Sequence, residues 1–64
     1  MNSREVIRLL QAADFEWVGG KGDHRVFRHR EIGRKVVVVH PERDVKIGLL
    51  IAYEKQSGIK LRSR

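Results

Sequence analysis

The sequence contains no cysteine, which excludes disulfide bonds, cysteine-ligated zinc and thiol catalysis. A chain without cysteine is also compatible with a reducing compartment. Its longest apolar run is the four valines at 36–39, far shorter than the roughly 20 residues of a membrane-spanning helix. No apolar stretch typical of a signal peptide follows Met1. We therefore expect a cytoplasmic protein with no membrane association.

The chain also has a single proline, no internal repeat and no low-complexity segment, so it offers no linker between domains. Its 64 residues are enough for one core of marginal size. We expect a single domain over residues 1–64, in which 58–64 form a mobile basic tail.

Positive charge is concentrated in the middle of the chain. Fourteen Lys and Arg against eight Asp and Glu give a net charge of +6. Residues 21–35 alone hold six basic and two acidic groups, a net charge of +4. Such a segment favours a polyanion-binding surface, although an ordinary solvated face explains it equally well. Basicity alone does not separate RNA from DNA or from an acidic protein.

Hydrophobic periodicity predicts two helices and three strands. Helices are expected at 3–13 and 46–57, where apolar residues recur every three or four positions. Strands are expected at 15–18, 24–30 and 35–40.

Residues with capping and turn-forming propensity bound these elements. Asn2 or Ser3 can cap the first helix and Asp44 the second, and Gly58 has the position of a C-terminal cap. The glycine-rich segment 19–22 is expected to end the first strand.

This order predicts an α+β fold, α-β-β-β-α, in which a three-stranded antiparallel sheet carries both helices on one face. Phe27 is a better core residue than Arg28, so odd-numbered residues of the second strand should point toward the helices. His24, Val26, Arg28 and Arg30 would then share the open face.

His24 is the strongest candidate for chemistry. It follows a loop in which Gly20 and Gly22 permit close approach to a ligand, and Lys21 and Arg25 add positive charge. RNA cleavage needs a base for the 2′-hydroxyl proton, an acid for the leaving oxygen and cations for the phosphate. An exposed surface histidine without a chemical role is the alternative interpretation.

The other histidines and the large aromatic residues are weaker candidates. The antiparallel neighbour brings position 40 beside position 24, so His40 could be a second proton-transfer group or satisfy a local backbone group. His29 is expected to be structural or exposed. Trp17 and Phe27 could stack on bases, but a core this small favours their burial. The histidine spacings match no common metal-ligand motif, and no cofactor is expected.

Several segments, taken together and in order, resemble the HicA toxins, the small mRNA interferases paired with HicB antitoxins. They are the Leu9-Leu10 pair, the aromatic first strand, the Lys21–His24 loop followed by Phe27, the valine strand ending in His40-Pro41, and the segment from Gly48 to Ile59.

The resemblance implies a fold like a double-stranded-RNA-binding domain, a metal-independent endoribonuclease acting on mRNA, His24 as catalytic residue and a HicB-like antitoxin as partner. The expected RNA-binding residues are Lys21, Gly22, Arg25, Arg28, Arg30 and Lys35.

The sequence departs from the family pattern at four places. Asp23 replaces a common serine, Gly19-Gly20 stand where an arginine is frequent, Leu49 replaces threonine, and Glu54 replaces an aliphatic residue. Asp23 could orient His24 but would also repel phosphate. A non-catalytic RNA-binding module is the main alternative function, and a module that binds an acidic protein is a third.

Overall fold

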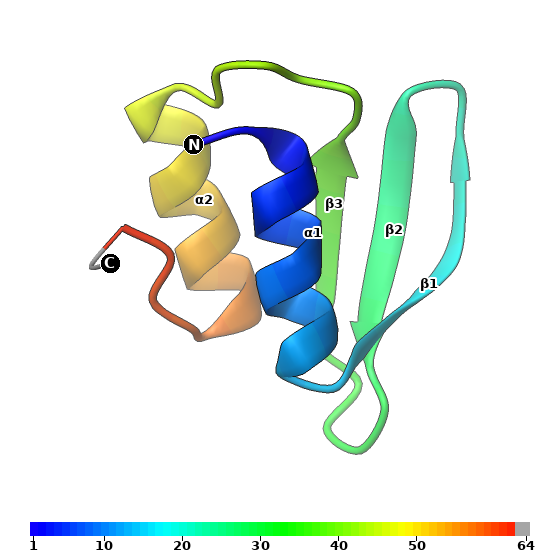
Figure 1. Ribbon diagram of the computed structural model, residues 1–64. Coiled ribbons are helices and arrows are strands. Elements are labelled where there is room, and N and C mark those ends of the chain that lie inside the picture. The colour runs from blue at the N-terminus through cyan, green and yellow to red at the C-terminus, as the bar shows by residue number, and fades with distance from the viewer. Residues whose placement is uncertain (63–64) are drawn as a thin grey trace.

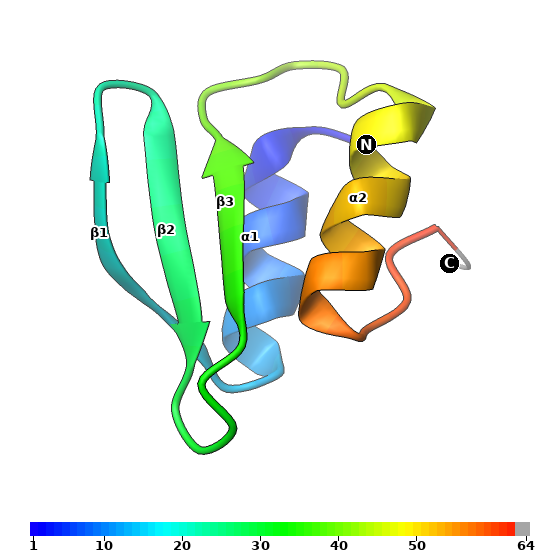
Figure 2. The same cartoon turned by 180° about the vertical axis from the view of Figure 1, so that it is seen from behind.

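The computed structural model describes residues 1–62. Its elements are α1 (Ser3–Ala12), β1 (Phe15–Lys21), β2 (His24–His29), β3 (Lys35–Val39) and α2 (Ile47–Ser57). The strands form one antiparallel sheet in the order β1-β2-β3. In Figures 1 and 2, α1 lies against one face of the sheet and α2 packs beside it along β3. The predicted α-β-β-β-α fold is confirmed.

Asn2 caps α1, which confirms the first of the two predicted alternatives, Asn2 or Ser3. Its Oδ1 accepts the backbone N–H of Glu5 at 2.9 Å, and Oε1 of Glu5 accepts the N–H of Asn2 at 3.2 Å. This reciprocal pair satisfies two backbone donors that a helix start leaves free. Val6 and Leu10 then place one face of α1 in the core.

Side-chain alternation in β2 separates a core face from an open face. Phe27, which is 1% exposed, pairs with Val36 of β3 beneath α1. Val26 pairs with the exposed Val37 on the opposite face. The prediction that odd residues point inward is confirmed. The core contains ten buried apolar residues: Val6, Leu10, Phe15, Phe27, Val36, Val38, Val45, Leu50, Tyr53 and Leu61.

Helix α2 protects the outer edge of β3. The hydroxyl oxygen of Tyr53 accepts the N–H of Val39 at 3.1 Å, and Oε1 of Gln56 accepts the N–H of Val37 at 3.3 Å. These bonds satisfy donors that an edge strand would otherwise leave exposed. Within residues 1–62, the outer edge of β1 has no such cover (Figure 2).

The start of α2 differs from the prediction, whereas its end agrees. Lys46 occupies the N-cap position without a side-chain cap bond, so Asp44 is not the cap. Ile47, the first residue of the helix, is 61% exposed. Gly58 ends the helix with φ of 80°, and its N–H donates to Glu54 O at 2.7 Å. Neither helix within residues 1–62 is long and apolar enough to span a membrane.

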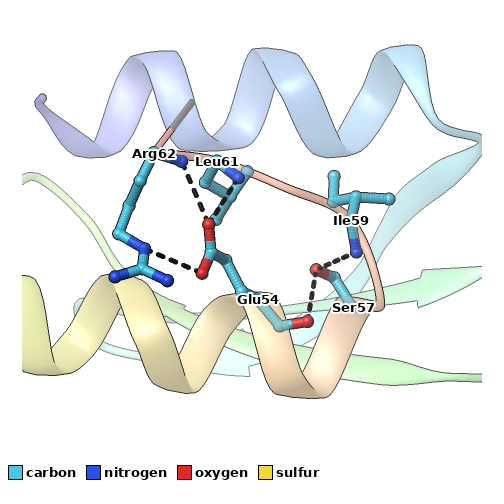
Figure 3. Close-up of polar contacts among 5 residues, drawn as sticks. All are labelled: Glu54, Ser57, Ile59, Leu61 and Arg62. Carbon is cyan, nitrogen blue, oxygen red and sulfur yellow. Dashed lines mark hydrogen bonds and ion pairs between the residues drawn. The ribbon is translucent and has the colours of Figure 1, made fainter. Parts of the chain in front are cut away.

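Residues 58–62, expected as the start of a mobile basic tail, pack against the domain, and residues 63–64 lie outside the described chain. Leu61 is fully buried in the core. Oε2 of Glu54 accepts the N–H groups of Leu61 and Arg62 at 2.8 and 3.0 Å, and Oε1 accepts Nε of Arg62 at 2.9 Å (Figure 3). Glu54 therefore anchors the segment that inserts Leu61.

Candidate functional site

The β1–β2 hairpin forms the side of the sheet that lies away from α2 and ends in a tight turn (Figure 1). The glycine-rich segment was predicted to end strand β1. The strand instead continues through it to Lys21, which pairs with His24. A β-bulge between Trp17 and Gly19 absorbs one residue. Gly22 and Asp23 form the two-residue turn, with positive φ at Gly22, as a type II′ turn requires.

Gly20 lets β1 pass close to β2. Its φ of 139° lies outside the range that side chains tolerate, and a Cβ there would collide with the backbone carbonyl of His24. Gly19 has no such neighbour. The hairpin backbone next to His24 therefore depends on Gly20 being glycine.

The turn presents His24 to solvent on the open face of the sheet. The side chain is 59% exposed, and Nδ1 lies 3.0 Å from Oδ1 of Asp23. An ionised carboxylate can only accept, so this bond places a hydrogen on Nδ1. In the neutral ring Nε2 is then the free acceptor, directed away from Asp23 and available to a ligand.

Four of the expected RNA-binding cations share this face: Lys21, Arg28, Arg30 and Lys35. Lys21 pairs with His24, and Arg28 pairs with Lys35 on one side and Glu16 on the other. Arg30 forms an exposed ion pair with Glu16 at 3.3 Å. Gly22 lies in the turn itself. Only Glu16 and Asp23 contribute negative charge among these paired and turn residues, so the surface around His24 is cationic.

Arg25 lies on the other face. It pairs with the buried Val38, and its guanidinium carbon lies 4.3 Å from the centroid of the Trp17 ring. Trp17 is 56% exposed, so the prediction of its burial is wrong. The physical reason is its place on the outer strand β1, which runs away from α1 after its start (Figure 1).

His40 is close to the hairpin along the backbone, but its ring is directed elsewhere. Its N–H donates to Asp23 O at 2.7 Å, which extends the β2–β3 ladder into the turn. Its Nδ1 lies 2.7 Å from Oγ of the buried Ser3. That hydroxyl also accepts the N–H of Glu42 at 2.8 Å. The structure therefore does not bring the two rings to one face.

His40 borders a pocket of about 220 Å³ at the N-terminus of α1, lined also by Arg4 and Arg43. His29 packs edge-on against Phe15, with ring centroids 5.1 Å apart. Its Nδ1 accepts the N–H groups of Glu31 and Ile32 at 3.1 and 3.3 Å, so it organises the β2–β3 turn.

Within residues 1–62, no group of three or more histidine, aspartate and glutamate residues is arranged to hold a metal ion. The cationic open face and the exposed histidine instead match the chemistry of an anionic ligand.

Comparison with known proteins decides the family. A family model described as the HicA toxin of bacterial toxin–antitoxin systems matches residues 3–59. The chain belongs to the HicA toxin family. No match was found among curated proteins. Membership implies a toxin, with nuclease activity as its general class, and an antitoxin partner.

Two departures from the HicA pattern acquire a structural explanation. Asp23 contacts His24 directly, so the carboxylate orients the ring. Glu54 does not disturb the packing of α2, because its carboxylate binds the segment that follows the helix. The core of this HicA chain continues past the matched region to Leu61.

Sequence reasoning missed three features: the Ser3–His40 bond, the Glu54 anchor and the exposed Trp17–Arg25 pair. The first two join residues far apart in sequence and leave no local signal. Alternation alone would not reveal the third, because only the bulge between Trp17 and Gly19 shifts the register and places Trp17 opposite Phe27, on the face of Arg25.

Proposed function

We propose that this chain is a cytoplasmic endoribonuclease toxin that cleaves mRNA without a metal ion, with His24 as its catalytic residue and a HicB-like antitoxin as its inhibitor. The observation that carries the proposal is the exposed His24 ring, fixed through Nδ1 by Asp23 on a cationic face. A pairing of this kind holds an imidazole in the tautomer that can accept a proton.

In the proposed reaction, Nε2 of His24 accepts the proton of a ribose 2′-hydroxyl. The 2′-oxygen attacks the adjacent phosphorus, the bond from phosphorus to the 5′-oxygen breaks, and the leaving oxygen takes a proton from water at this open site. The products are a 2′,3′-cyclic phosphate and a 5′-hydroxyl end. Because the His40 ring bonds Ser3 instead, it does not serve as the acid in this proposal.

Lys21 is the nearest candidate for stabilising the phosphate. Directly paired side chains in antiparallel strands lie about 5 Å apart at Cβ, so the Lys21 ammonium can reach a phosphate bound at His24. Its charge also offsets that of Asp23. Arg28 and Lys35 extend the positive surface along the sheet, where they would neutralise neighbouring phosphates.

The test replaces His24 with glutamine, which is polar and of similar reach but cannot shuttle a proton. Loss of a general base lowers rates by roughly 10²- to 10⁴-fold, so cleavage of labelled RNA in the presence of EDTA should fall at least 10²-fold. RNA affinity should stay within about threefold of wild type because no charge contact is removed. Electrophoresis against an alkaline ladder should identify cyclic phosphate ends.

Asp23→Asn is the matched variant, because it keeps the turn and the ring but exchanges the carboxylate for an amide. It should reduce cleavage less than His24→Gln does. Equal cleavage by His24→Gln and wild type would remove His24 from the mechanism. RNA binding without cleavage under all conditions would favour the non-catalytic RNA-binding module, and inhibition by EDTA would show that a metal is required.

A further inference from the structure

The exposed ring of Trp17 is held in a defined position. Its Nε1 donates to Gly19 O at 2.8 Å, and the guanidinium of Arg25 lies over the ring at 4.3 Å. A tryptophan that is 56% exposed normally changes rotamer freely, and these two contacts restrict it. The chain thus exposes a large aromatic surface to solvent in one orientation. Trp17 is not part of the hydrophobic core.

The surroundings of Trp17 favour an anionic ligand with aromatic groups. Arg25 stacks on the ring, and Lys21 follows four residues later on the same edge strand. The acidic side chains of this hairpin are engaged elsewhere, because Glu16 pairs with Arg30 and Asp23 with His24. A planar ring beside an unneutralised guanidinium is the combination that binds a nucleobase and its phosphate.

The edge between Trp17 and His24 carries one apolar side chain, the half-exposed Val18 at the bulge. Gly19 and Gly20 follow Val18 and precede Lys21, so the outer strand is bare backbone only at these two positions. His24 lies three residues from Phe27, the partner of Trp17, which is about 10 Å along the strand. A single strand of RNA could cross this edge and contact the Trp17 ring on one face and His24 on the other.

We propose that Trp17 and Arg25 form a stacking site for one unpaired nucleobase of the RNA, next to the nucleotide presented to His24. This inference rests on the proposed function only in taking RNA as the ligand, since it requires binding and not cleavage. It predicts that this toxin prefers single-stranded RNA over duplex, because a paired base cannot leave its stack without cost.

Trp17 is the only tryptophan of the chain, so its emission reports on this site alone. The experiment uses the full-length His24→Gln chain and three probes of equal length: a single-stranded RNA, the same strand without bases, and heparin as a polyanion control. Saturating RNA should quench the emission strongly. The abasic strand and heparin should bind with little quenching, because neither can stack.

Affinity measured by anisotropy of labelled RNA separates stacking from charge. Trp17→Leu removes the ring and keeps an apolar side chain, and it should weaken RNA binding by about 5- to 100-fold, as loss of one base–aromatic stack does. Its affinity for the abasic strand and its salt dependence should not change. Ile32→Ala, which truncates a similarly exposed apolar residue in the β2–β3 turn, is the matched control and should bind normally.

Equal quenching by the normal and abasic strands would overturn the stacking site, and so would wild-type RNA affinity in Trp17→Leu. If that variant instead lost only its affinity for the antitoxin, the ring would belong to the protein interface and the proposal would be wrong. Strong base-dependent quenching in a wild-type protein that cleaves no RNA would support the stacking site while removing the nuclease mechanism.

Discussion

Leu61 provides a direct test of where this domain ends. The side chain is fully buried although it lies two residues beyond the family match and between exposed Lys60 and Arg62. Replacing a buried leucine with alanine costs about 2–5 kcal/mol through lost transfer energy and the cavity left behind. Leu61 lies outside the helices and strands, so its segment can move to fill part of the space, and we expect about 2–3 kcal/mol here.

That loss is large for a chain of this size. Marginal stability of roughly 0.05–0.15 kcal/mol per residue gives about 3–10 kcal/mol for the whole domain. A change of 1 kcal/mol shifts Tm by about 4–8 °C in small domains, so Leu61→Ala should lower Tm by about 10–20 °C.

Thermal unfolding followed by circular dichroism measures the effect, with Lys60→Ala as the matched control because its side chain is exposed. The control should melt within about 2 °C of wild type, as surface substitutions usually do. An equally small shift for Leu61→Ala would refute the reasoning, because it would mean that residues 60–62 add nothing to the core.

Two further substitutions test local geometry. Hydrogen bonds from the backbone of Leu61 and then of Arg62 hold the pKa of Glu54 below its ordinary value of 4.5, so its ionised form stabilises the fold. Glu54→Gln should therefore melt lower than wild type at neutral pH, and the difference should shrink as pH falls from 4.5 through the lowered pKa; a pH-independent difference would contradict the charge assignment. Gly20→Ala should lower RNA cleavage about tenfold or more relative to Gly19→Ala. Only at position 20 would the added Cβ collide with the His24 carbonyl and strain the backbone, which must then move. Equal cleavage rates for the two variants would show that the hairpin tolerates a side chain at position 20.

The fold could be predicted because local and global signals agree. Asn2 and Glu5 have the spacing of a capping box, and Gly58 ends a helix that its periodicity had already indicated. In β2, alternation alone separated Phe27 from Arg28, which assigned the two faces of the sheet before any contact was known.

The wrong predictions arise where the structural role of one residue differs from what the composition of its neighbours indicates. Lys60 and Arg62 make the last segment polar in composition, which hides the one apolar side chain that enters the core. In the sequence, the glycines of β1 indicate the end of a strand. A β-bulge within a strand needs the same backbone freedom, so the strand can continue through them. Burial of Trp17 was wrongly predicted because hydrophobicity does not reveal which strand lies at the edge of the sheet.

The exposed position of His24 on the open face could be predicted, but the contacts that support its turn could not. The turn that carries it is joined to the domain through His40, whose N–H binds Asp23 O and whose ring binds Ser3 at the start of α1. Position 40 was expected beside position 24, but the register pairs His24 with Val39 and places the His40 backbone beside Asp23. Alternation then directs consecutive side chains to opposite faces, so the same register that brings His40 near the hairpin directs its ring toward the helix. In this arrangement one histidine meets solvent while the other fixes the turn that presents it.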